Sequence, residues 1–417
     1  MHTFQITDLP SNEATTETFL DGEIAVTSHS GLHLTESLLI NNLARISSPP
    51  GALLVAGNRT GAIAMAAAAR FPDCAITCHA FDLHHARAIL RNLAANRFGF
   101  AFSHDPFVTT AGTQVACAEK TSAPQFAVAC TAAIPQKAYA AACFMATPGT
   151  MTGELILDQL EDLHEALADG GTCLMACEAE SGPLFKQIKA IFGNISIHFD
   201  KNGISCVTAK KKGPLARRRD FSASFPASLP GGETYALTSL PGVFSHRRPD
   251  AGGLALAEIA ARELRPNLRV LDMGCGCGLV GILLAKSQPN VRVTFVDSHA
   301  RAMVATYRNL TALGIEKAQL VLSDEGLAKS GFHLVVGNPP YYSDFRIAEL
   351  FIKTALATLR QGGTCLMVAK AARALEERQA EIFGNAEILQ RRGYGVVKSF
   401  RHAFPSPTAG RPADSEE

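Results

Sequence analysis

The sequence predicts an α/β protein built from two tandem, doubly wound units, and three observations lead to this prediction. Two ten-residue stretches nearly coincide, DGGTCLMACE at 169–178 and QGGTCLMVAK at 361–370, and each is followed by IFGN. Short β-branched runs alternate with Ala- and Leu-rich helical patterns throughout the chain. The apolar runs are bounded by glycine, as is typical of parallel strands that are buried on both faces.

The repeat covers most of the chain, because further segments match in the same order. The matches are AVTSHSG (25–31) with ALTSLPG (236–242), LLVAGNRTG (53–61) with VLDMGCGCG (270–278), ITCHAFD (76–82) with VRVTFVD (291–297), RNLAANRFG (91–99) with RNLTALGIE (308–316), and FAVACTAAIP (126–135) with HLVVGNPPYY (333–342). We therefore predict a tandem duplication over about residues 23–210 and 233–402.

Composition excludes several classes of protein. The chain has 417 residues, of which 47% are hydrophobic and 18% charged, as in a globular protein of two or three domains. A net charge of +1 means that any attraction to nucleic acid must come from local patches. The longest apolar stretch, at 62–69, is too short to span a membrane, and the N-terminus has no secretory pattern. Eleven cysteines without zinc spacing predict reduced thiols, no metal site and a cytoplasmic location.

A glycine-rich loop in the second unit carries the first functional signal. Asp272, Gly274, Gly276 and Gly278 follow a predicted strand and open a predicted helix. Glycines let a backbone turn sharply and approach a ligand closely. An acidic residue before the first glycine favours a ligand with an amino group over a bare phosphate. Asp297 ends the next strand, where a carboxylate can hold ribose hydroxyls, so the pattern predicts a nucleoside site.

The second signal is Asn338-Pro339-Pro340-Tyr341, which follows the strand FHLVVG. Two prolines fix the backbone and remove two N–H donors, which leaves local carbonyls as acceptors beside the Asn338 amide. Tyr341 offers an aromatic face for stacking. The arrangement predicts a receptor for a planar group that carries an NH₂.

These motifs, in this order, resemble those of class I S-adenosylmethionine-dependent methyltransferases that act on exocyclic or amide nitrogens. The segments LTSLPGVFSHRRPDAGGLAL, NPPYY and GGTCLMVAKAARALEERQAEIFG narrow the resemblance to the bacterial ribosomal RNA guanine-N2 methyltransferases, namely small-subunit methyltransferase C and its large-subunit relative. That family is also duplicated, with a degenerate first copy. The resemblance covers 23–402 and is faint in the first half; Tyr341-Tyr342 stands where the family usually has Phe-His.

The resemblance implies a fold of two Rossmann-like class I methyltransferase domains, the first degenerate. The expected segments are a non-catalytic domain at 1–212, a linker at 213–232, a catalytic domain at 233–404 and a disordered tail at 405–417. The linker is basic at 210–219, and its charges could meet phosphates or simply be solvated. The implied partner is ribosomal RNA or a ribosomal subunit, with no membrane and an open oligomeric state.

The resemblance also implies roles for the site residues. The backbone of the three loop glycines would lie alongside the methionine part of S-adenosylmethionine. Asp272 would face its amino group, and Asp297 would bind the ribose. Asp324, in LVLSDEG, would lie at the adenine amine. Asn338 and the Pro339 carbonyl would accept hydrogens from the guanine NH₂, and Tyr341 would stack on the base. No strong general base is required.

Other residues near these motifs have both functional and structural interpretations. Cys275 and Cys277 are expected to be small fillers of the loop rather than nucleophiles. Phe244, Ser245 and Arg247 could line the cofactor mouth, approach RNA or be structural. His246 could act as an acid or base, although a surface loop is expected for it, and His84 and His85 are expected in a solvated loop.

Two other functions remain open at this point. The same fold could methylate adenine N6 or a protein glutamine amide. The chain could also be a non-catalytic RNA-binding or assembly factor, although the intact second-unit motifs argue against this.

The first unit is expected to bind no cofactor. Its loop has Ala56 in place of the acidic residue and Arg59 within the turn, and Thr131-Ala132-Ala133-Ile134 answers the Asn-Pro-Pro-Tyr motif. A cation in the turn would repel a sulfonium. A scaffold role is one hypothesis, in which Arg59, Arg87, Arg91 and the basic linker at 210–219 approach RNA; the alternative is that these charges are simply solvated surface.

Overall fold

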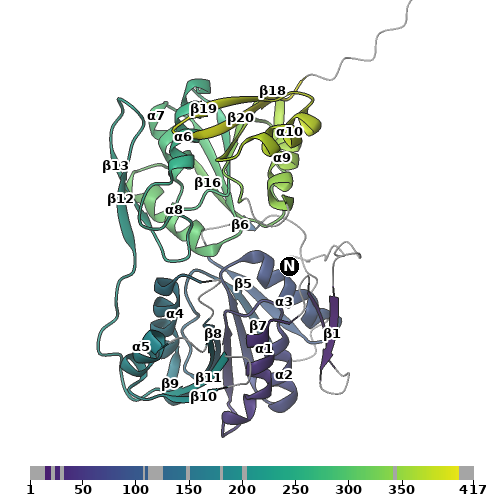
Figure 1. The fold of residues 1–417 in the computed structure, drawn as a ribbon, viewed down its shortest axis with the longest axis vertical. Coiled ribbons are helices and arrows are strands. Elements are labelled where there is room, and N and C mark those ends of the chain that lie inside the picture. The colour runs from purple at the N-terminus through teal and green to yellow at the C-terminus, as the bar shows by residue number, and fades with distance from the viewer. Residues whose placement is uncertain are drawn as a thin grey trace, which may run out of the picture.

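The structure, a computed structural model, has two lobes that correspond to the two halves of the sequence (Figure 1). It describes residues 15–19, 24–28, 32–106, 109–110, 125–146, 151–178, 182–199, 204–340 and 345–402. We call the part up to residue 212 the first half and the part from residue 213 the second half.

Strands and helices alternate along both halves, as predicted. The first half contains β1 Thr15–Phe19, β2 Ile24–Ser28, α1 Leu34–Asn41, β3 Ala52–Ala56, α2 Ala62–Arg70, β4 Ala75–Ala80, α3 Leu83–Ala95, β5 Phe100–His104, β6 Thr109–Thr110, β7 Phe126–Cys130, β8 Tyr139–Ala146, α4 Gly153–Ala166, β9 Leu167–Glu178, α5 Gly182–Phe192, β10 Ser196–Phe199 and β11 Ile204–Lys210. The second half contains β12 Ala223–Ala227, β13 Tyr235–Ser239, α6 Ala251–Ala260, β14 Arg269–Met273, α7 Leu279–Ser287, β15 Arg292–Asp297, α8 Ala300–Ala312, β16 Ala318–Leu322, β17 Phe332–Gly337, α9 Arg346–Thr358, β18 Leu359–Ala369, α10 Arg373–Phe383, β19 Glu387–Arg391 and β20 Tyr394–Phe400.

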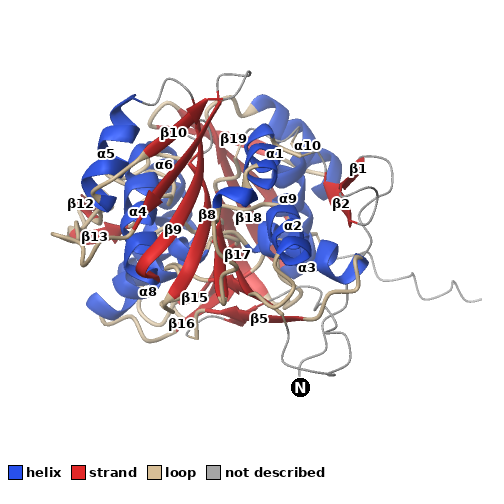
Figure 2. Cartoon of the chain, turned by 90° about the horizontal axis from the view of Figure 1, so that it is seen from below, coloured by secondary structure: helices blue, strands red, loops and turns tan. Residues whose placement is uncertain are grey.

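Each half is organised around a mostly parallel, eight-stranded sheet. The order is β10-β11-β9-β8-β3-β4-β7-β5 in the first half and β19-β20-β18-β17-β14-β15-β16-β6 in the second. Helices cover both faces of the sheets (Figure 2), and buried apolar clusters lie on each face. The apolar runs are therefore strands buried on both sides, as the sequence predicted.

The two sheets differ at one edge. In the first sheet β7 lies between β4 and β5, whereas in the second sheet β15 pairs directly with β16. Strand β6 of the first half pairs in parallel with β16 of the second. The first half thus contributes a short edge strand to the sheet of the second half.

Strand pairing corrects one of the sequence matches. The segment FAVACTAAIP was matched to the strand before Asn338, but it forms β7, which pairs with β4 and β5. The strand that lies between β3 and β9, as β17 lies between β14 and β18, is β8. In this register Phe144 corresponds to Gly337, so Met145, rather than Thr131, corresponds to Asn338.

Register also corrects two single-residue matches. Val55 pairs with Cys78 as Asp272 pairs with Phe295, so Val55, rather than Ala56, occupies the position of the loop carboxylate. The same register places Ala80, rather than Asp82, at the position of Asp297. For Asp297 the apolar pattern matched the right strand but left its register undetermined, because a buried strand carries no alternation that would fix it. For Asp272 the match of 53–61 with 270–278 already sets Val55 opposite it, and the error was to take the residue directly before the glycine.

The two halves contact each other where β4 and β15 end. Asp82 and His299 form an isolated antiparallel bridge, the Leu83 N–H donates to the Ser298 carbonyl (2.8 Å), and the Ala300 N–H donates to the Phe81 carbonyl (2.6 Å). By strand register, residues 81–83 of the first half correspond to residues 298–300 of the second, so each segment makes the same backbone contact to the other. We call residues 81–83 and 298–300 the seam.

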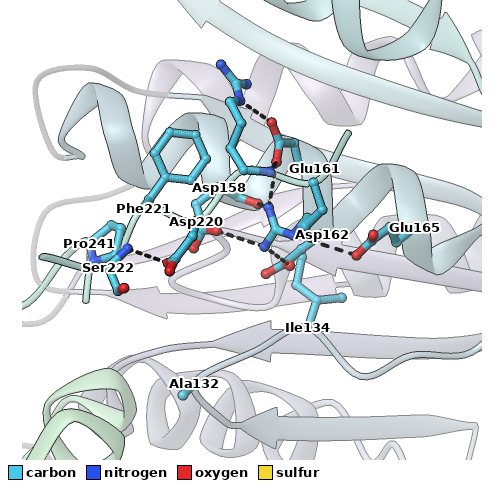
Figure 3. A network of polar contacts seen from close by, with 12 residues as sticks. Ala132, Ile134, Asp158, Glu161, Asp162, Glu165, Asp220, Phe221, Ser222 and Pro241 are labelled. Atoms are coloured by element: carbon cyan, nitrogen blue, oxygen red, sulfur yellow. Dashed lines mark hydrogen bonds and ion pairs between the residues drawn. The ribbon is translucent and has the colours of Figure 1, made fainter. Parts of the chain in front are cut away.

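The predicted linker at 213–232 is built into the structure. It contains β12, which pairs antiparallel with β13. Arg218 forms ion pairs with Asp158 (2.8 Å) and Asp162 (2.5 Å) of α4, and Arg219 pairs with Glu161. Figure 3 shows the acidic side chains of α4 gathered at this network. The side chains of Arg218 and Arg219 therefore pair with α4, whereas the sequence had left open whether the linker charges meet phosphates or are simply solvated.

Candidate active site

The glycine-rich loop connects β14 to α7 and is held against the end of β15. Gly274, Gly276 and Gly278 all have positive φ (65°, 57° and 85°), a conformation that side-chain-bearing residues rarely adopt. The N–H groups of Gly274 and Cys275 both donate to the Val296 carbonyl, at 2.8 and 3.1 Å. The three glycines therefore occur where the backbone turns, as predicted from the sequence.

Asp272 is buried beneath this loop. Its Oδ2 accepts a hydrogen bond from the Gly281 N–H at 2.8 Å, in the first turn of α7. Burial raises the pKa of Asp272 to about 7, and the nearby Asp297 contributes to this rise. Among the described residues no cationic side chain forms an ion pair with it. A buried carboxylate without a cation is suited to receive a positively charged group from a ligand.

Asp297 ends β15 and is anchored at both carboxylate oxygens. Oδ2 accepts from the Gly276 N–H and Oδ1 from the His299 N–H, each at 2.9 Å. Burial raises its pKa to about 6, against the lowering effect of these N–H groups. Each oxygen has a second lone pair, so the anchored carboxylate can still accept hydrogen bonds from hydroxyl groups.

The structure places Asp324 against the first half. Its side chain is 8% exposed and lies 3.0 Å from the Arg87 guanidinium of α3 and 3.6 Å from the His84 ring. The hydrogen bond to Asp324 raises the pKa of His84. Arg87 is itself 8% exposed, so it is not the surface contact for RNA that the sequence suggested.

Asn338 and Pro339 follow β17, whose neighbour β14 leads into the glycine-rich loop. Gly337 lies opposite Met273 in the parallel register, so the two loops leave adjacent strands at the same level. The Asn338 Nδ2 donates to Asp250 Oδ2 at 2.9 Å. Tyr341 lies outside the described residues.

Sequence reasoning missed Asp250. It is the N-cap of α6, and its Oδ2 also accepts from the Gly253 N–H at 2.6 Å. An Asp just before an apolar helical run signals a helix start, but the contact with Asn338 joins positions 88 residues apart and leaves no local signal.

The other residues that the sequence singled out near the loop lie in three different environments. Cys275 and Cys277 are buried, and burial raises the pKa of Cys277 to about 12, so it stays a neutral thiol. The His246 Nε2 lies 2.9 Å from the Phe221 carbonyl, and Arg247 pairs with Glu154 of the first half. Phe244 is 70% exposed.

Over the described ranges, no group of His, Cys, Asp and Glu side chains is placed to hold a metal ion. None of the described helices is both long and apolar enough to span a membrane.

Comparison with known proteins first defines the class. Residues 234–398, which hold the loop, Asp297 and Asn338, match the family model of the methyltransferase small domain. The fold of the whole chain is similar to that of a 16S rRNA N2 methyltransferase from T. thermophilus, solved with AdoMet and guanosine: the TM-score is 0.71 at 20% identity, over 93% of this chain and 98% of that one. The second half is thus a methyltransferase domain.

Curated relatives identify the family. The chain is 32% identical over 245 residues to ribosomal RNA small subunit methyltransferase C of Cronobacter sakazakii, covering 56% of this chain and 68% of the relative. It is 33% identical over 172 residues to the protein of that name from Pseudomonas entomophila, covering 40% of this chain and 51% of the relative. The chain belongs to the ribosomal RNA small subunit methyltransferase C family.

Proposed function

We propose that this protein transfers a methyl group from S-adenosylmethionine to the exocyclic N2 amine of a guanine in ribosomal RNA. One observation carries the proposal: the Asn338-Pro339 segment and the glycine-rich loop leave adjacent strands at the same level, since Gly337 pairs with Met273. A cofactor on the loop and an amine at Asn338 would therefore meet between the two loops. The family, together with the T. thermophilus protein of similar fold that is described as an N2 methyltransferase, favours guanine N2 over the adenine and glutamine alternatives.

The residues present fit this cofactor. The positive-φ glycines open a path for its methionine part, the buried Asp272 matches an amino group, and the anchored Asp297 has lone pairs for the ribose hydroxyls. When bound, S-adenosylmethionine supplies an electrophilic methyl group. Asp324 would reach the adenine amine from the position where Arg87 and His84 hold it.

The chain's contribution to the chemistry is orientation. The guanine amine lone pair is delocalised into the purine, so the amine is a weak nucleophile. The Asn338 Oδ1 and the Pro339 carbonyl accept hydrogens from the NH₂ and favour a geometry in which the lone pair points at the methyl group. Such fixed acceptors lower the barrier without a strong base. A paired guanine would have to leave its stack to reach them, and Tyr341 would then stack on it.

We further propose that only the second half, over 233–404, is catalytic and that the first half, over 1–212, is a degenerate copy joined by 213–232. Four positions support this: Val55, Arg59, Ala80 and Met145 stand at those of Asp272, Gly276, Asp297 and Asn338. An arginine and three apolar side chains replace the turn glycine, both carboxylates and the amide. The protein would act in the cytoplasm, where ribosomes assemble.

The function is tested by incubating the purified chain with bacterial ribosomal RNA, and separately with ribosomal subunits, and isotopically labelled S-adenosylmethionine. Nuclease digestion and mass analysis should find the label in N2-methylguanosine. Label in N6-methyladenosine or in a protein glutamine would overturn the proposal.

The single-site proposal predicts a binding stoichiometry. Isothermal titration with S-adenosylmethionine should give one site per chain, and this site should be weakened in D297A by about 1.5–3 kcal/mol, the range for lost hydrogen bonds to a charged group. Two sites per chain would show that the first half also binds cofactor.

A further inference from the structure

We infer that Asp250 is a positioning residue that sets which end of the Asn338 amide faces the substrate. This inference rests on the proposed function, because it concerns the same acceptor. An amide side chain has a donor end and an acceptor end of nearly the same shape. Only one orientation of Asn338 presents an oxygen to an NH₂ group; the other would set donor against donor.

The contacts around Asp250 fix that orientation. The Asp250 carboxylate oxygen can only accept, so the atom of Asn338 that lies 2.9 Å from it is the nitrogen. Oδ1 of Asn338 is then the end directed away from Asp250. The carboxylate cannot swing aside freely, because the same Oδ2 accepts from the Gly253 N–H at 2.6 Å. Asp250 is thus held by α6 and in turn holds Asn338.

The start of α6 is shaped around this carboxylate. Glycine is a poor residue inside a helix, yet two glycines stand in its first turn. A Cβ at Gly252 would lie 3.1 Å from Asp250 Oδ2 and 3.2 Å from the Tyr394 ring, and one at Gly253 would lie 3.4 Å from the same oxygen. The absence of side chains at both positions gives the carboxylate room to fold back over the helix and reach Asn338.

Two roles of Asp250, capping α6 and orienting Asn338, can be separated by side-chain length. Serine caps helices nearly as well as aspartate, but its hydroxyl is one bond closer to the backbone and does not reach Asn338. Asparagine can cap and can also turn its oxygen to the Asn338 nitrogen. The orienting role therefore predicts that D250S is impaired and that D250N is largely rescued.

The experiment measures kcat, KM for RNA, the dissociation constant of S-adenosylmethionine and the melting temperature for the full-length wild type, D250S and D250N. We expect D250S to lose at least about tenfold in kcat, the size of losing one hydrogen bond to a charged group. We expect its cofactor affinity and melting temperature to stay near wild type, and D250N to stay within a few-fold of wild-type kcat. T152A, which removes the N-cap of α4 in the first half, is the control for cap loss.

A double-mutant cycle with N338A completes the test. If Asp250 acts through Asn338, adding D250S to N338A should lower kcat no further. Wild-type kcat in D250S, or an undiminished loss from D250S in the N338A background, would overturn the positioning role. Wild-type protein that makes no N2-methylguanosine would instead overturn the proposed function, so the two failures are distinguishable.

Discussion

At the scale of single residues, the second half holds a buried Asp272 and a half-buried Asp297, and neither forms an ion pair with any described side chain. Burial raises the pKa values of Asp272 and Asp297 to about 7 and about 6, and repulsion by Asp297 contributes to the value for Asp272. Such an arrangement costs stability in the free protein, because each charge is desolvated. It favours a ligand that brings its own positive charge into the site.

These pKa values predict how cofactor affinity depends on pH. A raised carboxyl pKa means that protonation begins near neutrality, and only the ionised form attracts the amino group. The affinity for S-adenosylmethionine should therefore fall roughly tenfold from about pH 7.5 to about pH 6, as one group with a pKa near 7 is protonated. Calorimetry across this range checks it, and the pH dependence should be much weaker in D272N. A flat wild-type profile would contradict the role of Asp272.

We predict that loss of the Asn338 amide lowers the turnover rate but leaves cofactor binding nearly unchanged. N338A should keep cofactor affinity within a few-fold, because the bonds that anchor Asp297 and the loop do not involve Asn338. Its turnover should fall at least roughly a hundredfold, as when one preorganised transition-state contact is removed. Single-turnover kinetics at saturating cofactor measure this, and near wild-type turnover would rule out the assigned role.

At the scale of elements, the sequence predicted which segments form strands and helices better than where each strand lies. ARAMVATYRNLTALG predicted a helix, and α8 spans Ala300–Ala312. β7 was misplaced because its neighbours in the sheet lie far away in the chain, and an apolar run does not specify them. Asp272 and Asp297 could be predicted from the sequence because glycine spacing and strand ends are local signals. The contact between Asp250 and Asn338 forms only in the folded chain and has no local signal.

Helix α7 packs so closely against the sheet at Gly281 that we expect one added methyl group there to lower both stability and cofactor affinity. A Cβ at Gly281 would lie 2.4 Å from Phe295 Cε1 and 2.8 Å from Asp272 Oδ2. G281A should lower the free energy of unfolding by about 1–3 kcal/mol, the range for overpacking, and should weaken cofactor binding by displacing Asp272. Denaturant unfolding and calorimetry measure both effects. G99A, where the added methyl meets open space, is the matched control and should be neutral.

At the scale of the whole molecule, a buried cation joins the two halves. Arg301 of α8 is 3% exposed, donates to Asp158 of α4 (2.5 Å) and to the Ala132 carbonyl (3.0 Å), and lies over the Phe81 ring. It also donates to the Pro241 carbonyl of its own half, at 3.2 Å. Because this one side chain binds groups of both halves, it specifies how the lobes meet.

Removal of this cation should loosen the joint between the halves. R301A leaves a buried carboxylate with fewer partners, so we expect a loss of about 3 kcal/mol in unfolding free energy, at the lower end for a broken buried pair because Arg218 still contacts Asp158. Thermal unfolding checks this against R308A, an exposed arginine on the same helix. Equal melting temperatures for the two variants would show that Arg301 contributes little.

The seam gives the contact between the two halves a local twofold symmetry. Leu83 corresponds to Ala300 and Phe81 to Ser298, so its two backbone hydrogen bonds are the same bond made twice, once in each direction. Contacts of this reciprocal kind are the signature of an isologous homodimer, in which one surface patch serves both partners. The seam therefore relates the two halves locally as a twofold axis relates the subunits of such a dimer.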